Sequence, residues 1–317
     1  MSNPQPLIPN PSPLPRWLKR NVPKGNANHF TAKLIDRLGL QTVCDHAKCP
    51  NRMECYAEKT ATFLILGDTC TRGCRFCSVR KGMPGPLDPE EPRHVAEAAR
   101  QLGLEHVVVT CVTRDDLPDG GAEHFCQTIS EIRRATAATI EVLPSDFAGN
   151  AAAVDWLADA APQVYNYNTE TVPRLYPSVR QKGGHKGVRT VFGKNRSDPF
   201  SRDPFSREFP DYGWTLEMFR RIRRRNATIA LKTGLMLGLG ETRAELLDTL
   251  AELFEAGCRM LTLGQYLRPS PAQMPVVRYL PPEEFDELGR LARQIGFEHV
   301  ASGPFVRSSY HAGKMLS

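Results

Sequence analysis

Long apolar runs are missing from the start of the chain. Residues 1–15 carry six prolines among polar residues: Pro4, Pro6, Pro9, Pro11, Pro13 and Pro15. No stretch of the first thirty residues is therefore long enough for the apolar core of a signal peptide or for a membrane span. The sequence predicts a cytoplasmic protein that binds no membrane.

A strong excess of one charge is also missing. The chain has 41 Lys and Arg residues against 35 Asp and Glu residues, a net charge of +6 over 317 residues. Such a mildly basic surface is usually solvated background, so we expect no nucleic acid partner. With 41% hydrophobic and 24% charged residues, the composition is that of a globular protein, and one α/β barrel domain often reaches this length.

Cysteine is present, but not in the form of a disulfide framework. In a reducing compartment, thiols stay free for metal binding or catalysis. Six of the nine cysteines crowd into two triplets. The first has the spacing C-x4-C-x5-C at Cys44, Cys49 and Cys55, and the second has C-x3-C-x2-C at Cys70, Cys74 and Cys77.

The spacing of the triplets favours iron-sulfur clusters over zinc. Thiolates are preferred ligands of both. Structural zinc usually takes four ligands in paired C-x2-C or Cys/His knuckles, and neither triplet offers the second pair. Three cysteines on a four-iron cluster leave one iron open, where a small molecule could bind and react. A zinc-bearing basic protein that binds nucleic acid is the alternative from another functional class.

The pattern of hydrophobic residues predicts a parallel α/β sheet. Six short β-branched runs alternate with helical periodicity from Thr60 onward, as in successive βα units. The predicted strands are 62–66, 106–110, 139–143, 163–167, 229–237 and 260–263, and the predicted helices include 92–102, 122–135, 216–225 and 244–256. In a parallel barrel, catalytic groups gather at the carboxyl ends of the strands.

Several sequence blocks resemble those of one family. CTRGCRFCSV at 70–79, with Phe76 before its last cysteine, resembles the signature of the radical S-adenosylmethionine (SAM) superfamily. TVCDHAKCPNRMEC at 42–55 and RSSYHA at 307–312 resemble motifs of the lipoyl synthases. TRDDLPDGGA at 113–122, NTETVPRLY at 168–176 and GLMLGLGET at 234–242 extend the resemblance over residues 16–313. A biotin synthase or methylthiotransferase is a rival within radical chemistry, but those families lack the paired triplets and the RSSY ending.

This resemblance implies a partial (βα)6 TIM-like barrel with extensions that carry an auxiliary cluster. The domains expected are a flexible tail at 1–28, an N-terminal extension at 29–58, the barrel at 59–280 and a C-terminal extension at 281–317. Residues 181–210 look like an insertion, which is either functional or disordered, and its basic residues are a candidate contact for an acidic lipoyl domain.

The resemblance also implies the cofactors and the reaction. Cys70, Cys74 and Cys77 would hold a [4Fe-4S] cluster that binds SAM. Cys44, Cys49, Cys55 and Ser309 would hold a second, sacrificial [4Fe-4S] cluster. Two SAM molecules would be spent to insert sulfur at C6 and C8 of a protein-bound octanoyl-lysine. The simpler reading of Ser308 and Ser309 is a turn or a helix cap.

Other residues, Phe76 among them, are weaker candidates for SAM contacts. Asn168 and Glu170 follow the fourth predicted strand, and Lys232 lies in the fifth. Gly120 and Gly121 resemble a SAM-proximal loop of the family, although a plain turn also explains them.

The partners implied are octanoylated carrier proteins, namely the E2 subunits of 2-oxoacid dehydrogenases and the glycine cleavage H protein. A flavodoxin- or ferredoxin-type reductant and an iron-sulfur carrier are expected as well. The chain itself is expected to be a monomer.

Overall fold

The computed structural model describes residues 14–19, 28–180, 211–310 and 312–315, and every structural statement below concerns these residues. Most of the predicted N-terminal tail and all of the predicted insertion at 181–210 lie outside the described residues, as does His311.

One curved sheet forms the centre of the molecule. Its strands are β1 (Gln41–Thr42), β2 (Thr62–Ile65), β5 (His106–Cys111), β6 (Thr139–Leu143), β7 (Val164–Asn166), β8 (Ala230–Leu237), β9 (Met260–Gln265) and β10 (His299–Gly303), in that spatial order. Neighbours from β2 to β10 pair in parallel, and β1 pairs antiparallel with β2. The sheet is therefore an open partial barrel with β1 and β10 at its ends.

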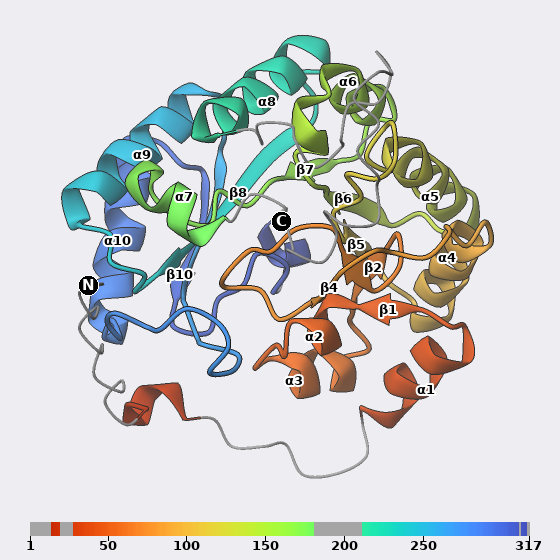
Figure 1. Ribbon diagram of the computed structural model, residues 1–317, viewed down its shortest axis with the longest axis horizontal. Coiled ribbons are helices and arrows are strands. Elements are labelled where there is room, and N and C mark those ends of the chain that lie inside the picture. Colours follow the sequence, from red (N-terminus) through yellow and green to blue (C-terminus); the bar gives the residue numbers. More distant parts are fainter. Residues whose placement is uncertain (1–13, 20–27, 181–210, 311, 316–317) are drawn as a thin grey trace, which may run out of the picture.

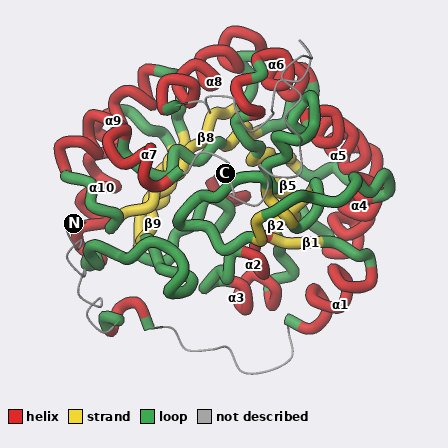
Figure 2. Tube along the Cα trace, viewed as in Figure 1, coloured by secondary structure: helices red, strands yellow, loops and turns green. Residues whose placement is uncertain are grey.

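Helices cover the outer face of the sheet. Figure 1 shows α4 (Glu91–Leu102), α5 (Ala122–Ala135), α6 (Ala151–Asp159), α8 (Tyr212–Arg225), α9 (Arg243–Glu255) and α10 (Pro282–Ile295) around the outside, and Figure 2 shows the strands inside them. Short helices α1 (His29–Arg37), α2 (Val43–His46) and α3 (Arg52–Ala57) precede β2, and α7 (Tyr176–Val179) follows β7. The smallest elements are the ribbon β3 (Thr69–Cys70) with β4 (Arg80–Lys81), and the 3₁₀ turns η1 (Arg16–Leu18), η2 (Phe147–Gly149), η3 (Pro173–Leu175) and η5 (Ala312–Met315).

Local sequence signals fix the ends of the helices. Helix α9 begins with a capping box, in which the Thr242 hydroxyl accepts from the Glu245 amide and the Glu245 carboxylate accepts from the Thr242 amide. Helix α4 ends at Gly103, whose φ of 67° is the left-handed conformation that glycine adopts without strain. Each cap satisfies backbone groups that the helix leaves open, and such caps contribute about 1 kcal/mol.

The fold confirms the predicted parallel α/β partial barrel. Each of the six predicted strands is present, and 139–143 has the predicted bounds. Strand β10 was not predicted, because its sequence HVASG is rich in small residues with weak strand preference, although all five of its residues pair in parallel with β9. Helix α6 was missed because AAAVDWLAD is apolar on most sides and lacks the polar face that marks a surface helix.

The interior is apolar at the sheet, and among the described residues it also holds the fully buried ion pair of Lys232 and Glu141. Val107, Val109, Ile140 and Leu261 are fully buried under the outer helices. Among the described residues, no helix is both long enough and apolar enough to cross a lipid bilayer.

Candidate active site at the mouth of the barrel

Both cysteine triplets open into one cavity of about 500 Å³ at the carboxyl ends of the strands. The sequence predicted this edge of the sheet as the site. Cys44 and Cys49 line the cavity from one side, and Cys70, Cys74 and Cys77 line it from the other. Ser308 and Ser309 of the C-terminal segment also line it. Segments more than 200 residues apart in the chain thus meet around one space.

The first triplet lies on α2, α3 and the turn between them. The Thr42 hydroxyl caps α2 by accepting from the Asp45 amide, and the Cys49 amide donates to the Cys44 carbonyl (3.1 Å). Burial raises the pKa of Cys44 to about 11 and that of Cys55 to about 12, and each rise is increased by the nearby thiols. These thiols therefore stay protonated at neutral pH until a metal displaces the protons.

The second triplet occupies the loop after β2. Two amide groups, of Thr113 and Arg72, donate to Cys70 Sγ at 3.4 and 3.5 Å, and the first of these ties the sulfur to the loop after β5. Burial raises the pKa of Cys77 to about 12 and also raises that of Cys74, and nearby thiols of the triplet contribute to both. The three thiols are thus close enough to interact.

The donor set fits iron-sulfur clusters better than single ions. In the described part of the chain, no three His, Cys, Asp or Glu side chains converge closely enough to hold one metal ion. Each triplet instead borders a cavity wide enough for a larger group, and its ligands are soft thiols, the ligand type that iron-sulfur clusters take.

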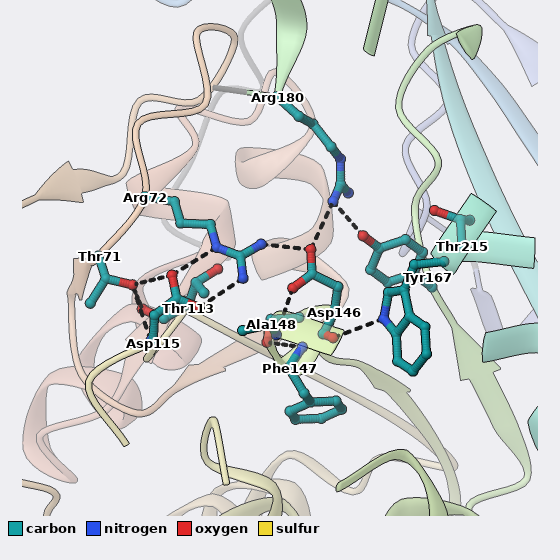
Figure 3. A network of polar contacts seen from close by, with 12 residues as sticks. Thr71, Arg72, Thr113, Asp115, Asp146, Phe147, Ala148, Tyr167, Arg180 and Thr215 are labelled. Atoms are coloured by element: carbon teal, nitrogen blue, oxygen red, sulfur yellow. Dashed lines mark hydrogen bonds and ion pairs between the residues drawn. The ribbon is translucent and has the colours of Figure 1, made fainter. Parts of the chain in front are cut away.

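A buried network of charges fixes the second triplet, and sequence reasoning missed it. The Arg72 guanidinium, 7% exposed, makes two hydrogen bonds to Asp115 (2.7 and 2.8 Å) and one to Asp146 (2.6 Å), as Figure 3 shows. The Thr71 hydroxyl also donates to Asp115. Arg72 thereby ties the cysteine loop to the loops after β5 and β6. The sequence did hold a signal for this network. Arg72 lies between two cysteines of the triplet, and TRDD at 113–116 offers carboxylates that could pair with it.

Arg180 extends this network to the cavity wall. Its guanidinium donates to the Tyr167 hydroxyl and to the Asn168 carbonyl, and it lies 4.0 Å from Asp146. The ring of Tyr167 also lies under the guanidinium, 4.9 Å from its centre. Arg180 and Tyr167 both line the cavity, so a buried positive charge faces the space beside Cys74.

Asn168 and Glu170 line the cavity, as a contact with SAM requires. Glu170 adopts a φ of 71°, uncommon for a residue with a side chain, and backbone hydrogen bonds to Gly234 and Met236 (both 2.9 Å) hold it there. Burial raises the pKa of the Glu170 carboxyl, while Arg180 partly offsets the rise. Asn168 Oδ1 is buried without a hydrogen-bond partner among the described residues. Asn168 Oδ1 therefore has unused acceptor capacity at the cavity wall, where Glu170 also lies.

The C-terminal motif forms a tight turn at the cavity. The Tyr310 amide donates to the Arg307 carbonyl (3.0 Å), which places Ser308 and Ser309 at the two central positions. Ser308 Oγ accepts a hydrogen bond from Asn168 Nδ2 (3.2 Å). In the described part of the chain, no side-chain hydrogen bond involves the Ser309 hydroxyl, so that oxygen is the one available to a ligand in the cavity.

Three predicted SAM contacts do not reach the cavity. Lys232 is 0% exposed, and its ammonium binds both oxygens of the buried Glu141 (2.9 and 3.0 Å) inside the barrel. Gly120 and Gly121 form a left-handed turn before α5, and a Cβ on Gly121 would lie 2.4 Å from Leu66. The glycines therefore serve close packing.

Three further residues, Phe76, Cys111 and Cys55, differ in whether they line the cavity. Phe76 lines the cavity, as predicted, and packs against the apolar cluster around Tyr266. Cys111, which belongs to neither triplet, lines the cavity at the end of β5. Cys55 is not among the residues that line the cavity, but its thiol interacts with those of Cys44 and Cys49.

Comparison with known proteins identifies the family. Residues 64–253 match the model of the Radical SAM superfamily. The chain is 54% identical to the lipoyl synthase of Rhodopirellula baltica, over 95% of this chain and 88% of that protein. It is 46% identical to the lipoyl synthase of Caldanaerobacter subterraneus subsp. tengcongensis, over 96% and 97%. The crystal structure of methylornithine synthase has the same fold, with a TM-score of 0.51, 12% identity and coverage of 84% and 75%. The chain belongs to the lipoyl synthase family of the radical SAM superfamily.

Proposed function

We propose that this chain converts a protein-bound octanoyl-lysine into the lipoyl group by inserting sulfur at C6 and C8. The observation that carries the proposal is the shared cavity, which brings two cysteine triplets and the RSSY turn to one place. When bound, a [4Fe-4S] cluster with SAM would supply a 5'-deoxyadenosyl radical at the second triplet, and a second cluster would supply sulfur at the first.

The second triplet would hold the SAM-binding cluster through Cys70, Cys74 and Cys77. The cavity wall next to it carries both signs of charge that an amino acid ligand requires. Glu170 and Asn168 Oδ1 present acceptors suited to the amino group of SAM, and Arg180 presents a cation suited to its carboxylate. The buried setting strengthens these interactions and keeps water from the reacting carbon.

The first triplet would hold the auxiliary cluster through Cys44, Cys49, Cys55 and Ser309. Ser308 is the less suitable of the two serines, because its hydroxyl accepts a hydrogen bond from Asn168. An oxygen ligand suits iron less well than a thiolate, so an iron bound to Ser309 would leave more readily than the others. That asymmetry suits a cluster that gives up sulfur, and each lipoyl group would then use two SAM molecules.

The partners follow from the reaction. An octanoyl-lysine must enter the cavity from a carrier protein, so we propose octanoylated lipoyl domains and the glycine cleavage H protein as substrates. A flavodoxin or ferredoxin would supply the low-potential electron, and an iron-sulfur carrier would rebuild the auxiliary cluster.

The test is an anaerobic turnover assay. The protein is reconstituted with iron and sulfide and incubated with SAM, dithionite and an octanoyl-lysine peptide, and the peptide is weighed by mass spectrometry. A gain of two sulfur atoms supports the proposal. Formation of 5'-deoxyadenosine with an unchanged peptide would leave radical chemistry in place and refute the substrate.

A further inference from the structure

The RSSY turn is fastened to the helix that carries the third cysteine of the first triplet. The Tyr310 hydroxyl donates to Glu54 Oε1 at 2.5 Å. The buried Asn51, at the start of α3, donates its side-chain amide to the Phe305 carbonyl at 2.8 Å. Both flanks of the turn are thus attached to α3. The Tyr310 contact is made by Glu54, the residue directly before Cys55.

The chemistry of Glu54 indicates that the contact is not incidental. A hydrogen bond from a phenol to an ionised carboxylate is charge-assisted and roughly twice as strong as a neutral one. The bond between Tyr310 and Glu54 is therefore strong enough to hold the turn against α3.

The geometry links this bond to Ser309. Tyr310 closes the turn through its amide, and Ser309 is the residue immediately before it. A turn held by Arg307 on one side and by the Tyr310 side chain on the other has little freedom to move its central residues. The position of the Ser309 oxygen thus depends on where Glu54 holds the Tyr310 ring.

We propose that Glu54 and Tyr310 form a clasp that positions Ser309 as the oxygen ligand of the auxiliary cluster. The inference rests on the proposed function, in which Ser309 is that ligand. In this account Glu54 and Tyr310 are positioning residues, because they act on the cluster through Ser309 and not by direct contact.

The test measures how fast iron leaves the first triplet. The full chain with Cys70, Cys74 and Cys77 replaced by Ala is reconstituted, so that only the first triplet is loaded, and a ferrous chelator then captures released iron. We expect Tyr310→Phe, Glu54→Gln and Ser309→Ala each to accelerate the release. For Tyr310→Phe, loss of a hydrogen bond to a charged group corresponds to about tenfold or more. Glu58→Gln also removes a carboxylate charge near Cys55 but lies outside the bond to Tyr310, so it should not accelerate the release.

A double variant separates the clasp from a general structural effect. Because the clasp acts through Ser309, Tyr310→Phe should add nothing to the release rate of Ser309→Ala. An equal acceleration in both backgrounds would overturn the inference, and so would an unchanged rate in Tyr310→Phe alone. An unchanged rate in Ser309→Ala would refute the ligand itself and the clasp with it, whatever the turnover assay shows. Tyr310→Phe keeps the ring, and far-ultraviolet circular dichroism checks that each variant is folded.

Discussion

Asn168 Nδ2 donates a hydrogen bond of 3.2 Å to Ser308 Oγ. This contact joins two segments of the cavity wall that are 140 residues apart in the chain. Asn168 follows β7, on the side where we place SAM, whereas Ser308 belongs to the turn beside the first triplet. The bond engages Ser308 and not Ser309, in agreement with the resemblance that singles out Ser309 as the ligand.

The serine pair gives the first prediction. Ser309→Ala should lose sulfur insertion while it still produces 5'-deoxyadenosine, because only the auxiliary cluster loses a ligand. Ser308→Ala should keep insertion, with a rate reduced by about fivefold, since it loses one hydrogen bond of about 1 kcal/mol. Peptide mass and 5'-deoxyadenosine are measured in the same reaction. Equal loss of insertion in both variants would contradict the assignment.

Glu170 should trade stability for SAM binding. Burial raises the pKa of its carboxyl above the value in the unfolded chain. The SAM-free protein therefore loses stability as pH rises from the unfolded-state pKa through the higher folded-state pKa. Glu170→Gln should therefore raise the melting temperature of the SAM-free protein at pH 7. It should also weaken SAM binding by about tenfold, because a neutral amide replaces the partner of an ammonium group.

Thermal unfolding and isothermal titration with SAM check the Glu170 prediction. In the unsubstituted protein, SAM affinity should fall as pH is lowered through the raised pKa of Glu170, since the protonated carboxyl no longer attracts a cation. Glu255→Gln, at an exposed position of α9, is the matched control. A lower melting temperature with unchanged SAM affinity would refute the role given to Glu170.

Arg72 should be irreplaceable by lysine. An ammonium group cannot reproduce the paired hydrogen bonds to Asp115 together with the bond to Asp146. Arg72→Lys should lower the free energy of unfolding by roughly 1–3 kcal/mol. It should also reduce cluster loading at the second triplet while the first triplet stays loaded. Chemical denaturation and electron paramagnetic resonance of the reduced protein test this, and full loading with unchanged stability would contradict it.

Lys232 should matter for folding and not for SAM. Its ammonium and Glu141 are both fully buried, and removing one member of such a pair costs roughly 3–5 kcal/mol. Lys232→Met should therefore lower the free energy of unfolding by about that amount, whereas Lys33→Met, at an exposed position of α1, should change it by less than about 0.5 kcal/mol. A folded Lys232→Met protein with weakened SAM affinity and unchanged stability would restore the sequence-based role.

Glu141 adds a pH dependence to the same pair. Burial opposes its ionised form, but Lys232 and His106 hold the pKa of Glu141 below its ordinary value. The stabilisation is therefore present above the pKa of the unfolded chain and is lost as pH falls through the lowered value. Denaturation curves between pH 7 and the acid range should show a smaller pH dependence in the Lys232→Met protein.

The sequence predicted the sheet well where a strand is a compact run of β-branched and other apolar residues. The composition of VVVT at 107–110 and IEVL at 140–143 is enough to predict buried parallel strands. Strand β10 carries no such signal, since it depends on β9 as a template and not on its own residues.

The candidate site was predictable where chemistry repeats in a short motif. Cysteines at fixed spacing stand out in any sequence. The charged network of Arg72, Asp146 and Arg180 does not stand out. Its paired members are separated by up to 74 residues in the chain and meet only where the ends of the strands converge. The role of Lys232 was predicted wrongly, because its position in a strand does not reveal that its ammonium group is paired with the buried Glu141 inside the barrel.

The most direct measurement compares the unsubstituted protein with a variant in which Cys44, Cys49 and Cys55 are all replaced by Ala. Both are reconstituted and given SAM, dithionite and an octanoyl-lysine peptide, and 5'-deoxyadenosine and peptide mass are followed together. The account predicts that both proteins form 5'-deoxyadenosine but only the unsubstituted protein adds sulfur to the peptide. Sulfur insertion by the variant would contradict the claim that the first triplet holds the sulfur donor.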